Sequence, residues 1–303
     1  MSTEGGTRAV VAALIANLGI AVSKFVAFVI TGSTSMLSEA IHSTADSLNQ
    51  VLLLVGGKKS KRKADEKFQF GYGRLRYVYG FVVAIVLFII GGVYSVYEGW
   101  HKIHEPHPVD HVAIAVGVLV VAIVLESFSF RTAIIEANRA RGKRSMGQFV
   151  RDAREPELPV ILLEDFGALV GLVLALTGVI LAYVTHDGRW DGLGAVSIGV
   201  LLIVIAVVLV REMASMLIGE AALPEEERAV REALESAPLV ERVIHLRTLH
   251  VGPEALLVAA KISISPERSS LEIVQGIDEA EAILRAAVPS AEYVFIEPDH
   301  FRD

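Results

Sequence analysis

Six long apolar stretches occupy the first two-thirds of this chain and limit what it can fold into. Each is close to the ~20 residues that a helix needs to cross a bilayer. The first is too long for a signal peptide and leads into further spans. The stretches cover residues 9–30, 35–57, 77–100, 109–130, 158–185 and 193–210. The sequence therefore predicts an α-helical membrane protein with six transmembrane helices, and it excludes a soluble enzyme.

The composition narrows the chemistry that the chain can perform. Its 303 residues are 53% hydrophobic, which leaves room for a membrane domain and one small soluble domain. The chain contains no cysteine, so disulfides, thiolate zinc sites and thiol redox chemistry are excluded.

Two loops between the spans carry most of the Lys and Arg residues. Between spans two and three lie Lys58, Lys59, Lys61, Arg62, Lys63, Lys67, Arg74 and Arg76, and between spans four and five lie Arg131, Arg139, Arg141, Lys143, Arg144, Arg151 and Arg154. The opposite loops contain only Lys102 and Arg189. The positive-inside rule therefore places both termini in the cytoplasm. Basic loops also suit anionic lipid or nucleic acid, but topology alone explains them, and we expect no nucleic-acid partner.

The charge balance changes after the sixth span. From Glu212 onward the chain has 18 acidic and 8 basic residues, hence a net charge of −10 within a total of −7. We therefore expect a transmembrane domain over residues 1–213 and a soluble cytoplasmic domain over residues 214–303.

The pattern of this second domain predicts the element order αββαβ. Pro224 and the acidic residues after it open the first helix, and two strands follow at 243–251 and 256–264. A capping box at Ser269 opens the second helix, and the third strand lies at 293–297. Apolar residues alternate along the second strand and predict one buried face, made of Leu256, Val258, Ala260, Ile262 and Ile264.

Two pairs of ionisable residues lie inside the predicted spans. His42 and Asp46 are one helical turn apart in the second span, and Glu164 and Asp165 are adjacent in the fifth. Ionisable groups inside a bilayer are costly, so those that occur there usually mark an ion path or a proton relay. Because residues i and i+4 share a helix face, His42 and Asp46 can reach one ion.

The two spans run in opposite directions, and their ionisable pairs lie at compatible depths. Asp46 is about 16 Å along the second span from the outside, and Asp165 about 9 Å along the fifth from the cytoplasm. In a core of ~30 Å they can share one site. One imidazole with several carboxylates suits a first-row divalent cation, tetrahedral zinc first, and a structural polar cluster is the alternative. Ser38 and Asn49 continue the polar stripe. Asn17 is a candidate either for supporting the ligands or for a hydrogen bond between helices.

With these residues the chain resembles the cation diffusion facilitator family over nearly all of its length. The resemblance rests on the HxxxD of span two, the Phe70-Gly71-Tyr72-Gly73-Arg74 entry to span three, the six spans, and the ending Phe295-Ile296-Glu297-Pro298. It implies a homodimer that exchanges zinc, manganese, iron or a related ion for protons, as an efflux or compartment-loading transporter. We expect it in the cytoplasmic membrane. The resemblance also implies a ferredoxin-like, metallochaperone-like C-terminal domain and no prosthetic group, with Zn²⁺ as transported substrate and H⁺ as counter-ion.

Two departures from the family pattern affect the expected ligands. The family's fifth-span motif has two ligands four residues apart, and here Asp165 takes the second place and apolar Ile161 the first. Either Glu164 replaces the missing ligand, as in a subgroup with Glu-Asp here, or water fills that place. Phe68 and Phe295 stand where relatives carry histidine, so the accessory cytoplasmic site is expected to be absent. The remaining candidates for metal in the C-terminal domain are His245, His250, Glu297, Asp299 and His300.

Four of the nine histidines fall in one outward-facing loop, at His101, His104, His107 and His111. They are candidates for holding released metal weakly at the exit. A polar loop around Pro106 and Pro108 needs no such function, so both interpretations remain open.

Other ionisable residues in the spans have structural interpretations. Lys24 and Glu39 lie in the outer third of adjacent spans, which predicts an interhelical pair or snorkelling. Glu126 lies near the cytoplasmic end of span four beside Arg131, which favours helix docking over ligation.

The function that follows is proton-coupled efflux of a divalent cation, with zinc first and Fe²⁺, Mn²⁺ or Co²⁺ as alternatives. An intramembrane zinc hydrolase would fit the ligand types. However, no HExxH or comparable constellation supplies its general base, so we expect no enzyme. A metal sensor would need an output domain that the sequence lacks.

Overall fold

The structure is a computed structural model that describes residues 3–300, with side chains from residue 17 onward. The chain divides into two compact units. One consists of Met1–Gly56 and Val78–Met213, and the other of Gly57–Tyr77 and Ala214–Asp303. The segment that links the second and third long helices therefore belongs to the same unit as the C-terminal residues. The domain boundary at residue 213 stays a prediction.

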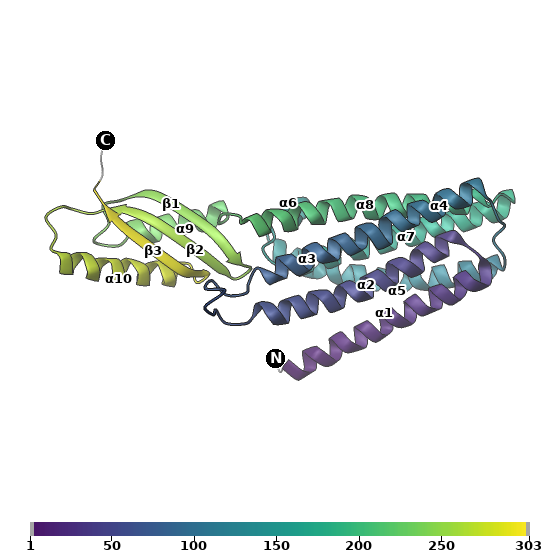
Figure 1. The fold of residues 1–303 in the computed structure, drawn as a ribbon, viewed down its shortest axis with the longest axis horizontal. Helices are drawn as coiled ribbons and strands as arrows, with labels where there is room; N and C mark the ends of the chain where they lie inside the picture. Colours follow the sequence, from purple (N-terminus) through teal and green to yellow (C-terminus); the bar gives the residue numbers. More distant parts are fainter. Residues whose placement is uncertain (1–2, 301–303) are drawn as a thin grey trace. The chain divides into compact units, whose positions relative to one another are not determined.

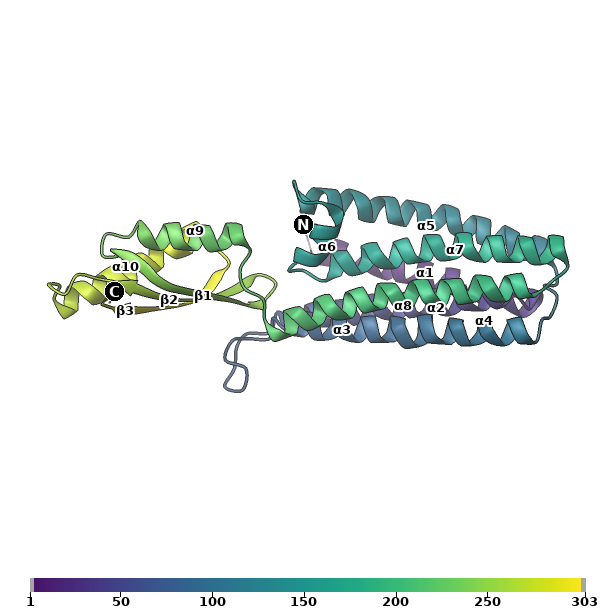
Figure 2. The ribbon, with the colours of Figure 1, turned by 90° about the horizontal axis from the view of Figure 1, so that it is seen from above.

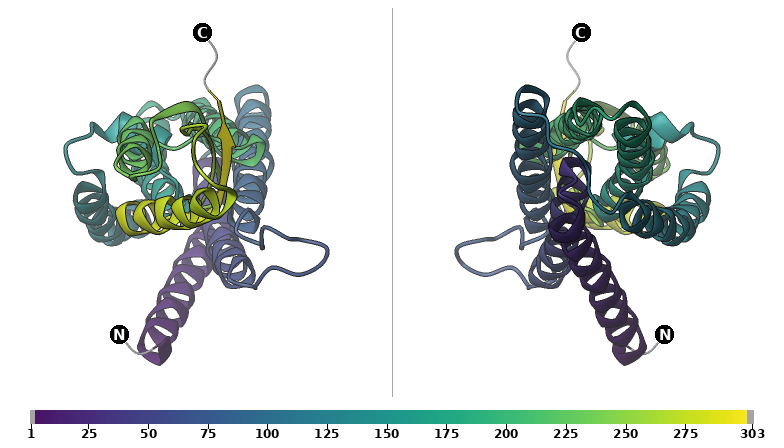
Figure 3. Two further views of the ribbon diagram at one scale, coloured as in Figure 1. Left: turned by 90° about the vertical axis from the view of Figure 1, so that its left-hand side faces the viewer. Right: turned by 90° about the vertical axis from the view of Figure 1, so that its right-hand side faces the viewer.

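The first unit is a set of long helices that run side by side (Figures 1 and 2). α5 packs along α7 and contacts α1, and Figure 3 shows α1 inclining away from the other helices toward its N-terminal end. A π-helical stretch, η1, joins α3 and α4 into one helical run. The elements are α1 (Thr3–Thr31), α2 (Thr34–Ser60), α3 (Leu75–Val86), η1 (Leu87–Val93), α4 (Tyr94–His104), α5 (Val112–Arg141), α6 (Met146–Asp152), α7 (Glu157–Thr185) and α8 (Arg189–Ile218).

Helices in this unit are long and apolar enough to cross a membrane. Among the described residues, four helical runs meet that condition: Leu75–His104, Val112–Arg141, Glu157–Thr185 and Arg189–Ile218. The described apolar part of α1, Asn17–Thr31, is shorter. α2 is less apolar because it carries a buried polar stripe that includes Ser38, Glu39, His42 and Asn49. The protein therefore has a helical membrane domain, and the number of six spans stays a prediction.

The beginning of α2 is held by a residue far along the chain. Asp191, near the start of α8, accepts hydrogen bonds from the backbone N–H groups of Thr34 at 2.7 Å and Ser35 at 3.2 Å. It also accepts one from the Ser33 hydroxyl at 2.7 Å. The first N–H groups of a helix have no partner within the helix, so this carboxylate does the work of a capping side chain. The contact fixes the position of α2 along its axis.

The C-terminal unit has the predicted element order αββαβ. Its elements are α9 (Pro224–Glu235), β1 (Arg242–Gly252), β2 (Ala255–Ser263), α10 (Ser270–Ala287) and β3 (Ala291–Asp299). β1 pairs antiparallel with β2, and β2 pairs parallel with β3, which gives the sheet order β1-β2-β3.

The buried face of the sheet is the one that the alternation predicted. Its residues on and just after β2 are all buried: Leu256, Val258, Ala260, Ile262 and Ile264. Val230 of α9 and Leu284 of α10 belong to the same core, so both helices cover this one face. The capping box between Ser269 and Glu272 at the start of α10 is also confirmed.

Candidate metal centre

His42 and Asp46 lie one turn apart on α2, with 3.5 Å between His42 Nδ1 and Asp46 Oδ1. The imidazole is fully buried. Among residues 17–300, neither ring nitrogen of His42 has a hydrogen-bond partner, and neither has Asp46 Oδ1. Buried polar atoms are normally paired. This pair therefore presents coordinating atoms that the rest of the described protein does not use.

Glu164 and Asp165 lie on α7 and contact different neighbours. Glu164 Oε1 accepts a hydrogen bond from Asn49 Nδ2 on α2 at 2.6 Å. Asp165 Oδ2 accepts one from Ser129 Oγ on α5 at 2.8 Å. Successive residues point about 100° apart around a helix of 3.6 residues per turn, so α7 offers one carboxylate to each neighbouring helix.

One small cavity brings the carboxylates of α2 and α7 together. Its volume is about 30 Å³, comparable with the share of one water molecule in the liquid. Asp46, Glu164 and Asp165 line it, whereas His42 lies one turn away along α2 and does not. The other lining residues are Asn17, Ile20, Ser43, Gln50, Glu126, Ser129 and Ile161.

Glu126 on α5 is a fourth carboxylate at this cavity. The prediction that it serves helix docking beside Arg131 missed this placement. The same signal that marked the other ligands could have found it, because an acidic residue inside an apolar span is costly and usually functional. Four carboxylates around so small a volume make the cavity attractive to a cation.

Lys24 of α1 and Glu39 of α2 form a fully buried ion pair, with 3.0 Å between Nζ and Oε2. The predicted interhelical pair is therefore confirmed. Lys24 Nζ also donates a hydrogen bond to Ser43 Oγ at 2.7 Å. Because Ser43 lines the cavity, this ammonium group lies one side chain away from the carboxylates. Ser38, one turn before His42, is buried, and its hydroxyl has no partner within residues 17–300.

The helices bring the candidate ligands near one another without completing a coordination shell. In the part of the chain described with side chains, no three His, Asp or Glu residues converge closely enough to hold a metal ion. Asp46, Glu164 and Asp165 share the cavity, and His42 contacts Asp46. Coordination by all four would require side-chain rotation.

The outward-facing histidines make separate local contacts. His101 Nε2 lies 3.6 Å from Glu105 Oε2, and His104 Nδ1 lies 2.9 Å from the Trp100 carbonyl oxygen. His107 packs through its backbone against Gly188, and His111 adopts a left-handed conformation before α5. The loop is therefore held by contacts that need no metal.

Three of the candidates in the C-terminal unit, His250, Glu297 and Asp299, have side-chain partners nearby. Lys261 Nζ lies 3.0 Å from Asp299 Oδ2 and 3.1 Å from Glu297 Oε1. Lys261 donates hydrogen bonds to Asp299 and Glu297, which raise its pKa above the ordinary value, so the lysine stays charged. His250 is buried with Nε2 3.8 Å from Glu226 Oε2, and exposed His245 lies opposite Lys261 across the strands.

Residues 10–218 match the cation efflux transmembrane domain, which is more than half of the chain. The chain therefore belongs to the cation efflux family, the cation diffusion facilitators. The members of this family are transporters and not enzymes.

Individual relatives agree with this family assignment. The proton-coupled zinc antiporter SLC30A9, mitochondrial, of Xenopus laevis is 32% identical over 265 residues, which cover 86% of this chain and 47% of the relative. Metal tolerance protein C4 of Arabidopsis thaliana is 26% identical over 269 residues, with 88% and 58% covered. The chain thus spans about half the length of these relatives. A solved MamM C-terminal domain variant matches at 21% identity and a TM-score of 0.26, covering 27% of this chain and 100% of that one.

Proposed function

We propose that this protein exports divalent cations from the cytoplasm in exchange for protons, with Zn²⁺ as the preferred cargo. One observation carries the proposal: carboxylates from α2 and α7 line a single small cavity, with His42 one turn away. Imidazole together with carboxylates suits zinc and its first-row neighbours. The zinc antiporter among the relatives supports both the cargo and the counter-ion.

His42, Asp46 and Asp165 form the core ligand set, with Glu164 as the fourth ligand. Asn49 orients Glu164 and Ser129 orients Asp165, as hydrogen-bonding partners of metal ligands commonly do. Asn17 and Ser38 support the site from the cavity wall and from the turn before His42.

The same ligands explain the exchange. A metal ion needs neutral imidazole and ionised carboxylates, so protons and metal compete for the site. If the site faces the cytoplasm with metal and returns from the outside with protons, the two ligands favour opposite states of one equilibrium. The result is export driven by an inward proton gradient.

The proposed assembly is a homodimer in the cytoplasmic membrane, with six spans and both termini in the cytoplasm. Residues 1–213 form its transport domain and residues 214–303 its cytoplasmic domain. The Lys and Arg residues of two loops support this orientation.

Proteoliposomes loaded with a zinc-sensitive dye and a pH-sensitive dye test the function. The wild-type protein should move zinc with opposite proton flow, and Asp46→Ala should abolish both. Thr44→Ala is the control, because Thr44 is an exposed residue on the same helix whose hydroxyl donates a hydrogen bond to the Ala40 carbonyl of its own helix. Zinc flux in Asp46→Ala equal to that of Thr44→Ala would rule the site out, and hydrolysis of a peptide or ester without ion flux would rule transport out.

A further inference from the structure

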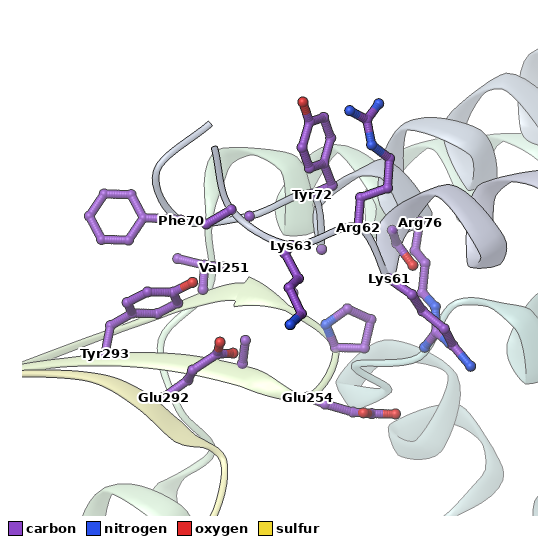
Figure 4. A pocket seen from close by; sticks show the side chains of 17 residues that line it. Lys61, Arg62, Lys63, Phe70, Tyr72, Arg76, Val251, Glu254, Glu292 and Tyr293 are labelled. Atoms are coloured by element: carbon purple, nitrogen blue, oxygen red, sulfur yellow. The ribbon is translucent and has the colours of Figure 1, made fainter. Parts of the chain in front are cut away.

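A second cavity, of about 340 Å³, lies entirely within the C-terminal unit (Figure 4). One wall is the segment from Ser60 to Arg76, and the other is the β1–β2 turn at 251–255 with Glu292 and Tyr293 of β3. Its volume falls in the range of small-molecule sites. It shares no residue with the candidate metal centre.

Basic side chains dominate the wall of this cavity. The charged residues that line it are Lys61, Arg62, Lys63, Arg76, Glu254 and Glu292. Four basic and two acidic residues thus line the cavity, although the chain from Glu212 onward has 18 acidic and 8 basic residues. A cationic cavity in an otherwise acidic domain favours an anionic ligand.

The two lysines have charges that the protein does not neutralise by pairing. Among residues 17–300, the ammonium groups of Lys61 and Lys63 form no ion pair. Figure 4 shows the Lys63 side chain extending from its segment toward the β1–β2 turn. Both lysines are therefore free to contact a ligand.

The carboxylate of nearby Asp65 forms hydrogen bonds within its own turn. It accepts hydrogen bonds from the Tyr72 hydroxyl at 2.5 Å and from the Phe68 backbone N–H at 2.8 Å. The Tyr72 hydrogen bond holds the pKa of Asp65 below its ordinary value. Arg62 stacks on the Tyr72 ring at 4.4 Å, so the turn is ordered before any ligand arrives.

The two walls are held together by close contacts. A Cβ on Gly73 would lie 2.8 Å from Gly252 Cα, so the two backbones touch only because both residues are glycine. The Phe70 and Tyr293 rings meet edge to face with centroids 5.1 Å apart. Gly71, at a φ of +70°, makes the turn that presents Phe70 to the cavity. The cavity is therefore a formed site with one aromatic side.

We propose that this cavity binds a phosphate ester, with Lys61 and Lys63 contacting the phosphate and the Phe70–Tyr293 pair packing against the organic part. The positive-inside rule accounts for basic residues in this segment, but it requires neither a cavity nor an aromatic wall beside them. Two sources supply this chemistry. Ser60 ends α2 and Leu75 begins α3, so on the proposed topology phospholipid headgroups lie within reach, and soluble nucleotides are the other source.

Calorimetric titration of the full chain in neutral detergent tests this site. The probes are short-chain phosphatidic acid, AMP and inorganic phosphate. The test variant is Lys61→Gln with Lys63→Gln, and the matched control is Lys58→Gln with Lys67→Gln. The control removes two charges from the same segment at residues that do not line the cavity.

We expect the wild type to bind a phosphate ester and the test variant to bind it about tenfold or more weakly, because charge-assisted hydrogen bonds are lost. The control should stay within about twofold. Tighter binding of phosphatidic acid than of AMP would identify a phospholipid headgroup as the ligand. Equal or tighter binding of AMP would identify a nucleotide as the ligand. Equal weakening in both double variants would show diffuse electrostatic attraction and overturn the proposal, as would a wild type that binds none of the probes.

Discussion

Asn49 on α2 donates a hydrogen bond from Nδ2 to Glu164 Oε1 on α7 at 2.6 Å. Both side chains are buried, so neither can exchange this partner for water without cost. The bond therefore sets the register of the two helices that carry the candidate ligands. It also leaves Glu164 in contact with α2, the helix that carries His42 and Asp46.

Replacing Glu164 tests whether it is the fourth ligand. Glu164→Gln keeps an acceptor for Asn49 but removes the charge, so zinc affinity should fall about tenfold or more, or ~1.4 kcal/mol or more. Calorimetric zinc titration measures this, with Glu155→Gln at an exposed position as the matched control. An affinity unchanged from the control would mean that water takes the fourth place.

Replacing Glu126 tests the carboxylate that the sequence did not mark. Glu126→Gln removes one of four carboxyl groups around a cavity of about 30 Å³. Zinc affinity and zinc flux should therefore fall about tenfold, because a carboxyl group that can attract the cation is lost. Glu136→Gln is the control, since Glu136 is an exposed residue of the same helix paired with Arg139. Equal zinc flux in the two variants would return Glu126 to a structural role.

Zinc binding should depend steeply on pH. Protons and metal compete for the imidazole and the carboxylates of the proposed site, so zinc affinity should fall as the pH drops from about 7.5 to about 6. His42→Asp should admit Mn²⁺ more readily, because a carboxylate is a harder ligand than an imidazole. Affinity that stays constant over this pH range in the wild type would exclude proton exchange at the site.

Lys24 and Glu39 should stabilise the fold only when both are present. Both side chains are fully buried, so Lys24→Met or Glu39→Gln alone leaves an unpaired partner and should cost about 3–5 kcal/mol. The double variant should recover much of this loss. Thermal unfolding in detergent, followed by tryptophan fluorescence, measures all three. Additive losses in the double variant would show that the two residues act independently.

Local patterns in the sequence were sufficient to predict several features of this protein. The αββαβ order and the buried face of β2 follow from alternation and capping, which involve residues close together in the chain. The placement of His42 and Asp46 on the same face of one helix follows from their spacing alone. An interhelical contact was predictable for Lys24 and Glu39 because buried charges need partners, although snorkelling was the alternative.

The sequence by itself determined the apolar helices, the HxxxD turn and the family. Only the tertiary structure decided that Glu126 lines the same cavity as Asp46 and Asp165, that Asp191 caps α2, and that the Lys61–Lys63 turn forms a cavity with the β1–β2 turn. The contacts between helices depend on how each helix is rotated about its axis and how far it is shifted along that axis. Packing between elements distant in the chain sets both quantities, and residue spacing within one element does not encode them.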